Sequence, residues 1–240
     1  MSTTATATAA PAAPPIEKQT TVGNYFVSNY PPFSFWKPEF VPDMLAALER
    51  RPAEGADGSA TPLGVYLHIP FCRKRCHFCY FKVYTDKDSA AIRGYIDAAL
   101  RELSFYADKP AVAGRKANFV YFGGGTPSYL SVDQLTHLSE GMKKLVPWDE
   151  AEEVTFECEP GTLTPHKLEA IRKMGVTRLS LGVENFDDHI LEINGRAHHS
   201  KEIARSYAFA RELGFPQINI DLIAGMVEET EDNWRECVRK

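Results

Sequence analysis

Residues 153–183, EVTFECEPGTLTPHKLEAIRKMGVTRLSLGV, decide the fold. The stretch holds two short runs rich in apolar residues, Glu153–Cys158 and Arg178–Val183, which are typical of buried strands. Between them lies a helical segment, Pro165–Met174, which begins after a threonine and is followed by a glycine, as helices commonly are. Two strands joined by a helix predict a parallel βαβ unit.

The same alternation continues on both sides of this unit. Further strands are predicted at Gly64–Ile69, Asn118–Phe122 and Gln217–Ile223, and further helices at Ser89–Ala107, Ser131–Leu145 and Lys201–Leu213. Right-handed crossovers curl such a series into a full or partial barrel, or an open doubly wound sheet. We expect an α/β fold, a partial parallel (β/α) barrel. Because the chain stops inside a predicted helix at Glu229–Lys240, we expect a barrel truncated after about five βα units.

The part of the chain before the first strand has a different composition. Residues 1–20 are rich in Ala, Thr and Pro and are predicted to form a disordered tail without a signal peptide. Residues 21–62 are predicted to be an aromatic and proline-rich arm, a short helix at Val41–Arg51 and a linker. Residues 63–240 are the predicted barrel core.

The composition excludes several classes of function. The 240 residues are 44% hydrophobic and 25% charged, as is usual for a globular protein. The net charge of −5 argues against a nucleic-acid partner, and no apolar run reaches the ~18 to 20 residues of a membrane span. Five cysteines, three of them within eight residues, do not suggest a disulfide framework. A metal site in the reducing cytoplasm is the better interpretation.

The three clustered cysteines form a C-x3-C-x2-C motif, Cys72, Cys76 and Cys79, directly after the first predicted strand. Zinc is one interpretation, with His77 or His68 as the fourth ligand. A disulfide with one free thiol is another. The third is an iron–sulfur cubane, in which three thiolates would leave one iron open for chemistry.

The motif, with Phe78 before its last cysteine, resembles the radical S-adenosylmethionine (SAM) superfamily. That resemblance implies a 4Fe-4S cluster whose open iron chelates the amino and carboxylate groups of SAM. An electron from the cluster then cleaves SAM, and the resulting 5′-deoxyadenosyl radical abstracts hydrogen from a substrate. The resemblance also implies that Phe78 lies at the cofactor site. Cys158 follows Glu157 on a predicted strand and should point to the other face, so Cys158 and Cys237 are interpreted as cysteines that are not ligands.

Polar or flexible residues follow the later strands. Gly124, Gly125 and Thr126 lie in a glycine-rich loop that is either a tight turn or an approach for an anion, because glycine leaves backbone N–H groups unobstructed. Glu157 ends the third predicted strand, where it is either solvated or an acceptor for hydroxyl groups.

The last two predicted strands carry further candidates. Arg196 is either a surface residue or a partner for a carboxylate. Asp221, inside an apolar run, needs a partner and is expected to face the barrel interior. The pair His198-His199 has no spacing to another ligand set, so both histidines are expected to be solvated.

Four motifs beyond the cysteines are similar to the oxygen-independent coproporphyrinogen III oxidases and their relatives. They are YLHIPFC from Tyr66, FGGGTPSYL from Phe122, GVENF from Gly182 and NIDLIAG from Asn219. This family converts two propionates of coproporphyrinogen III to vinyl groups. The resemblance implies that Tyr66, Gly124 and Glu157 contact the first SAM. It places Gly125, Thr126, Glu184, Arg196 and Asp221 near a second adenosyl ligand or the substrate.

The candidate catalytic residues are Tyr66 and His68, the latter as a support for the cluster or for proton and electron transfer beside it. A tetrapyrrole substrate and a reductase or flavodoxin-type electron donor are the partners that the resemblance implies. One or two SAM molecules are expected to bind.

Two residues depart from the pattern of the oxidases. Phe81 stands where they have a further cysteine, and Glu184 stands where they have Gln. Ionised Glu only accepts hydrogen bonds and would repel a substrate carboxylate. Two alternatives to decarboxylation therefore stay open: a relative that methylates or opens a haem ring with two SAM molecules, and a haem-binding chaperone that keeps its cluster without turnover.

Overall fold

The computed structural model describes residues 36–55 and 59–240. The predicted tail at residues 1–20, and the part of the arm before residue 36, lie outside the described residues. Residues 46–240 form one compact unit. The first helix, α1 (Val41–Leu48), follows a short 3-10 turn at Pro38–Phe40 and ends three residues before the predicted bound.

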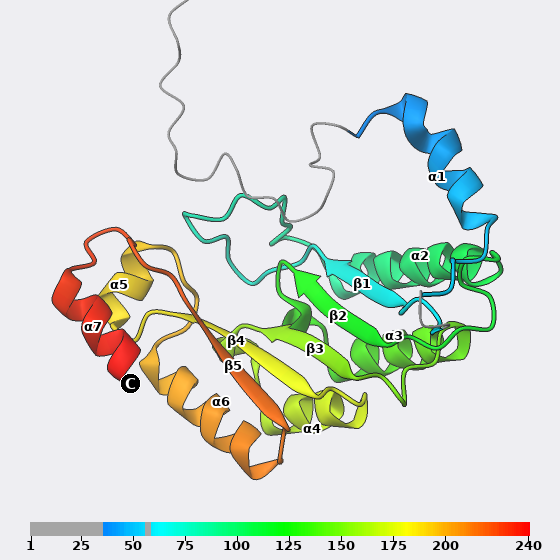
Figure 1. Ribbon diagram of the computed structural model, residues 1–240. Coiled ribbons are helices and arrows are strands. Elements are labelled where there is room, and N and C mark those ends of the chain that lie inside the picture. The colour runs from blue at the N-terminus through cyan, green and yellow to red at the C-terminus, as the bar shows by residue number, and fades with distance from the viewer. Residues whose placement is uncertain (1–35, 56–58) are drawn as a thin grey trace, which may run out of the picture. The chain divides into compact units, whose positions relative to one another are not determined.

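A parallel sheet of five strands forms the centre of the compact unit (Figure 1). Its strands are β1 (Gly64–Ile69), β2 (Phe119–Gly124), β3 (Glu153–Cys158), β4 (Arg178–Glu184) and β5 (Gln217–Leu222). They lie in the order of the sequence, and each pairs in parallel with the next. Every strand therefore delivers its following loop to the same edge of the sheet, where parallel α/β folds bind their ligands.

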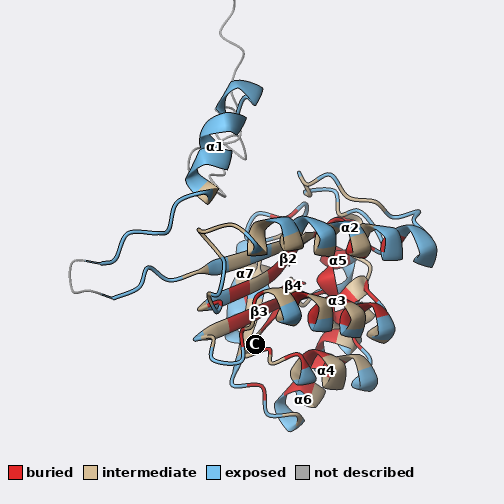
Figure 2. Ribbon diagram, turned by 90° about the vertical axis from the view of Figure 1, so that its right-hand side faces the viewer, coloured by how far each residue is buried: buried red, intermediate tan, exposed pale blue. Residues whose placement is uncertain are grey.

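Four helices pack along one face of this sheet (Figure 2). They are α2 (Ser89–Ala107), α3 (Val132–Leu145), α4 (Pro165–Lys173) and α6 (Ser200–Glu212). Two short helices, α5 (Asp188–Ile193) and α7 (Glu231–Arg239), and 3-10 turns at Pro127–Tyr129 and Pro160–Thr162 complete the fold. No helix in the described part of the chain is long and apolar enough to cross a membrane.

The hydrophobic core lies between the sheet and these helices. Successive strand residues point to opposite faces, so alternate residues such as Val120, Phe122, Phe156 and Leu181 are fully buried. The other face of the sheet is open and carries aromatic and polar side chains. Tyr66, for example, is 57% exposed there.

The predicted strand–helix alternation is confirmed, and the helix at Ser89–Ala107 has the predicted bounds. Ser131 caps α3 in a capping box with Gln134, so this helix begins one residue later than predicted. Gly175, just past α4, takes a positive φ of 92°. The short helix α5 was not predicted, because six residues are too few to show a helical period.

Candidate functional site

A cavity of about 230 Å³ opens at the carboxyl edge of the sheet. The loop after β1 supplies one wall, and the ends of β2–β5 with their loops supply the rest. Most of the predicted site residues line it: Cys72, Cys76, Phe78, Cys79, Gly124, Gly125, Thr126, Glu157, Glu184, Arg196 and Asp221. The structure brings these residues together in one cavity, and their roles stay proposals.

The first cysteine is fixed by backbone contacts. The Cys72 amide donates to the Tyr84 carbonyl at 3.1 Å, and the Tyr84 amide donates to the Pro70 carbonyl at 2.8 Å. Cys72 is buried, and the Thr126 hydroxyl donates to its sulfur at 3.3 Å. Burial raises the pKa of the Cys72 thiol above its ordinary value. Ionisation of the Cys72 thiol to a thiolate therefore requires a compensating positive charge or a metal.

His77, between the second and third cysteines, joins the cysteine loop to the segment after α5. Its amide donates to the Asn194 carbonyl at 3.0 Å, and its ring Nδ1 donates to the Ile193 carbonyl at 3.0 Å. Gly195 takes a positive φ of 79°, and a Cβ there would lie 2.9 Å from the His77 ring. His77 therefore holds two loops together.

The donor set fits a cluster better than a single ion. All five cysteines are free thiols. Among residues 36–55 and 59–240, no three His, Cys, Asp or Glu side chains converge closely enough to hold one metal ion. Zinc needs four ligands at ~2.0–2.3 Å from one centre. A cubane takes one thiolate on each of three different irons, so Cys72, Cys76 and Cys79 can stand farther apart.

The glycine loop packs directly against the cysteine loop. The Gly125 amide donates to the Ile69 carbonyl at 2.8 Å, and a Cβ on Gly125 would lie 2.9 Å from the Cys72 sulfur. Gly124 takes a positive φ of 109°, and a Cβ there would lie 2.7 Å from the His68 ring. No side chain fits at either position, so the loop can bring its backbone to the cysteines only with glycine.

Glu157 projects from β3 into the cavity with both carboxylate oxygens engaged. The Tyr121 hydroxyl donates to one oxygen at 2.6 Å, and the Gly124 amide donates to the other at 3.1 Å. Burial raises the pKa of Glu157, and these two hydrogen bonds oppose the rise. The carboxylate is thereby fixed in orientation and keeps lone pairs free to accept hydrogen bonds from hydroxyl groups.

The two candidate catalytic residues, Tyr66 and His68, lie next to the cavity but do not line it. The Tyr66 hydroxyl is 2.9 Å from His68 Nδ1. Burial and the charge of Glu157 raise the pKa of Tyr66 to about 12. Burial lowers the pKa of His68. Both groups therefore favour their neutral forms at neutral pH.

Glu184 and Arg196 lie side by side in the cavity wall. Glu184 ends β4 at a positive φ of 66°, a conformation that costs energy for a residue with a side chain. Its carboxylate lies 3.6 Å from Arg196 Nη2. Burial raises the pKa of Glu184 to about 7, against the opposing charge of Arg196. Glu184 can therefore be protonated at neutral pH and then also donate a hydrogen bond.

Asp221 lies on the open face of β5, as expected, and is exposed at the cavity. It accepts hydrogen bonds from Ser180 Oγ and from Asn219 Nδ2, both at 2.7 Å. These partners hold the carboxylate at the cavity wall.

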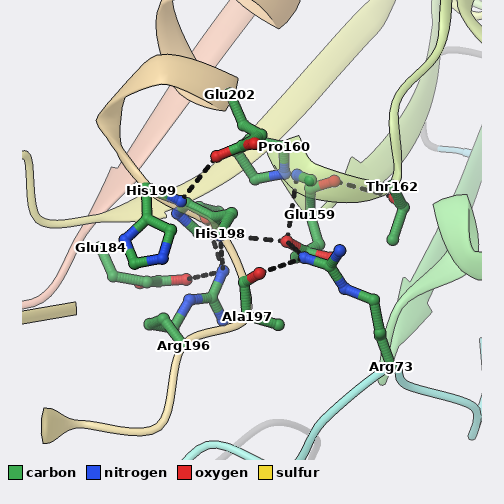
Figure 3. Close-up of polar contacts among 12 residues, drawn as sticks. Arg73, Glu159, Pro160, Thr162, Glu184, Arg196, Ala197, His198, His199 and Glu202 are labelled. Carbon is green, nitrogen blue, oxygen red and sulfur yellow. Dashed lines mark hydrogen bonds and ion pairs between the residues drawn. The ribbon is translucent and has the colours of Figure 1, made fainter. Parts of the chain in front are cut away.

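The prediction that both His198 and His199 are solvated is wrong for His198 (Figure 3). His198 is 1% exposed, and its ring contacts the Val183 carbonyl at 3.2 Å and the Glu159 carboxylate at 3.1 Å. The Glu159 carboxylate also accepts a hydrogen bond from Arg73 Nη2 at 3.1 Å. No local spacing in the sequence indicated this cluster, because Arg73, Glu159 and His198 lie in three separate loops.

Comparison with known proteins identifies the class. Residues 66–240 match the radical SAM superfamily, and the chain belongs to it. Membership implies a 4Fe-4S cluster and SAM, in agreement with the cysteine set. The predicted fold class is confirmed by the solved structure of coproporphyrinogen III oxidase from Escherichia coli. That structure matches with a TM-score of 0.78 and 29% identity, over 89% of this chain and 48% of the other.

The curated relatives include proteins of two kinds, heme chaperones and oxygen-independent coproporphyrinogen III oxidases. The heme chaperone HemW of Bacillus subtilis is 37% identical over 166 residues, which is 69% of this chain and 43% of the relative. The oxygen-independent coproporphyrinogen III oxidase of Escherichia coli is 32% identical over 173 residues, which is 72% of this chain and 37% of the relative. The predicted family resemblance is confirmed. The chain spans less than half the length of these relatives.

Proposed function

We propose that this chain carries a radical SAM active site that acts on a tetrapyrrole, by oxidative decarboxylation of coproporphyrinogen III. One observation carries the proposal: a single cavity brings together three free cysteines, a glycine loop, and carboxylates from three strands. When bound, the cluster and SAM supply the 5′-deoxyadenosyl radical that abstracts hydrogen. The remaining tasks fall to the residues of the chain.

The first SAM would be held between the glycine loop and β3. The glycine loop brings its backbone close to Cys72 with no side chain between them, and it suits the amino group of a methionine; the amides of Gly124 and Gly125 already donate within the protein. Glu157, fixed by Tyr121, suits the hydroxyl groups of a ribose. Tyr66 lies beside them with its ring centroid 5.9 Å from that of Tyr121.

A second adenosyl ligand or the substrate would lie against Glu184, Arg196 and Asp221. Glu184 replaces the Gln of the oxidases, but it differs from that Gln less than an ionised carboxylate would. Because burial raises its pKa to about 7, a protonated Glu184 both donates and accepts, as a Gln would. A substrate carboxylate could then approach Glu184 without repulsion, and Arg196 could pair with it.

The proposal includes a cytoplasmic location and a protein electron donor. Free thiols persist in a reducing compartment, and all five cysteines are free. Lys74 and Arg75 are exposed on the cysteine loop, so an acidic protein such as a flavodoxin could approach the cluster there.

The test is an anaerobic assay of the reconstituted protein with SAM, dithionite and coproporphyrinogen III. We expect 5′-deoxyadenosine, carbon dioxide and a vinyl product. Glu157→Gln should weaken SAM binding and slow 5′-deoxyadenosine release, because an amide is a weaker acceptor for hydroxyl groups. Release of 5′-deoxyadenosine without a vinyl product would contradict decarboxylation. Methyl transfer from labelled SAM would favour the methylating alternative.

A heme chaperone function is the second candidate, and one observation favours it. Phe81, in place of the further cysteine, packs its ring against His68 and Tyr80, with centroids 5.6 and 4.4 Å apart. An aromatic group of this kind suits the flat face of a haem. This candidate predicts stable haem binding with little 5′-deoxyadenosine. Rapid release of 5′-deoxyadenosine on addition of a substrate would exclude it.

A further inference from the structure

Arg196 contacts one of the three cysteines through its guanidinium group. Its Nη1 lies 3.2 Å from the Cys76 sulfur, and its Nη2 donates to the Gly182 carbonyl at 2.6 Å. The side chain is only 10% exposed. A guanidinium group keeps its charge in proteins. A permanent positive charge is therefore held against a thiol of the cysteine motif.

The wall of the cavity fixes the position of this guanidinium. Gly182 has no space for a side chain, because a Cβ would lie 2.9 Å from the Glu184 carboxylate and 3.4 Å from Arg196 Nη2. His198, two residues farther along the same loop, is buried beside Arg196 and contacts the Val183 carbonyl at 3.2 Å. The loop that carries Arg196 is thus attached to the end of β4.

Glu159 ties this loop to the cysteine loop (Figure 3). Its Oε1 accepts from Arg73, the residue after Cys72, at 3.1 Å and lies 3.1 Å from His198 Nδ1. Arg73 also donates to the Ala197 carbonyl. One buried carboxylate therefore links a residue adjacent to a cysteine with the loop of Arg196. The other carboxylate oxygen, Glu159 Oε2, is buried and has no hydrogen-bond partner among the described residues.

We propose that Arg196 donates a hydrogen bond to the sulfur of Cys76 and thereby raises the reduction potential of the cluster. We further propose that Glu159 and His198 are positioning residues for Arg196. The inference rests on the cluster of the proposed function. Reduction adds negative charge to the cluster, and hydrogen bonds to its sulfurs help set its potential. A charged donor stabilises the reduced form more than the oxidised form.

The first test measures the potential of the reconstituted full chain by redox titration monitored by EPR, without SAM or substrate. Arg196→Met keeps an unbranched side chain and removes the charge and the guanidinium donors. We expect about a tenfold smaller equilibrium constant for one-electron reduction, a downward shift of about 59 mV. His199→Ala, an exposed neighbour, serves as the matched control and should leave the potential unchanged. An unchanged potential in Arg196→Met would overturn the inference.

A double-mutant cycle tests the positioning role. His198→Leu should lower the potential in the wild-type background and leave it unchanged in the Arg196→Met background, because its effect passes through the arginine. Equal shifts in both backgrounds would indicate general disturbance of the site and overturn the positioning role.

A measurement on the wild-type chain guards against variants that fail to fold. Arginine labelled with 15N in the guanidinium group should show a nitrogen coupling to the reduced cluster in pulsed EPR. Absence of that coupling in a protein with a full cluster would overturn this inference and leave the proposed function standing. A wild-type chain that assembles no cluster would instead overturn the proposed function and the inference with it.

Discussion

The two faces of the sheet use alternate residues of the same strands for different purposes. On the face covered by helices, Phe122, Phe156 and Leu181 are fully buried and make the core. On the open face, Tyr121 and Glu157 are the immediate neighbours of these core residues and point into or beside the cavity. The covered face is specified by apolarity and volume. The open face is specified by hydrogen-bond partners and by the absence of side chains at glycines.

The difference teaches which changes should affect stability and which should affect chemistry. A residue on the covered face has no polar partner to lose, so its loss leaves a cavity. A residue at the carboxyl end of the open face has few apolar contacts but fixed partners. Of two adjacent residues on one strand, replacing the one on the covered face should therefore mainly lower stability. Replacing the one on the open face should mainly lower activity.

The largest expected effect on stability is on the covered face. Phe156→Ala should lower the free energy of unfolding by ~3–5 kcal/mol, because Phe156 is fully buried and its ring lies against Phe122 with centroids 5.3 Å apart. Glu157→Gln, at the next residue, should cost much less. Urea denaturation of both variants measures the contrast. Similar losses at the two positions would break the distinction between the faces.

The next effect is a pH dependence on the open face. The pKa of Glu184 is raised from 4.5 to about 7, so the folded chain favours its protonated form. Relative to Glu184→Gln, the wild-type chain should lose about 3 kcal/mol of stability as the pH rises from 4.5 through 7, because each pKa unit corresponds to about 1.4 kcal/mol. Urea denaturation at several pH values measures the difference. A pH-independent difference between the two proteins would contradict this assignment.

The smallest effect concerns a single hydroxyl group. Tyr121→Phe should cost about 1 kcal/mol, because it removes the hydrogen bond to Glu157. Since that hydrogen bond lowers the pKa of Glu157, the pKa should rise further in the variant. NMR titration of the carboxyl carbon measures the rise. Tyr207→Phe, on the exposed surface of α6, is the control and should change neither property.

Much of the fold could be predicted from the sequence because the covered face has a simple requirement. Buried parallel strands need apolar residues, and helices need a period and caps, as at Ser131 and Thr164. The helix α5 escaped detection because it is too short for a period.

The site could be predicted where a motif carried it, as in the cysteine and glycine loops. The cluster of Arg73, Glu159 and His198 could not, because it is assembled from three loops that are far apart in the sequence. The burial of a histidine depends on how these loops pack, and no local pattern records that packing. The positive φ of Glu184 is likewise set by the geometry at the end of β4.

The iron and sulfide content after anaerobic reconstitution, together with EPR of the reduced protein, tests the central claim most directly. The account predicts about four irons in the wild-type chain and their loss together in Cys72→Ala, Cys76→Ala or Cys79→Ala. Cys158→Ala, at a buried cysteine of β3, is the matched control and should keep the cluster. A single bound zinc in place of the cluster, or a full cluster that survives the loss of any of the three cysteines, would contradict the account.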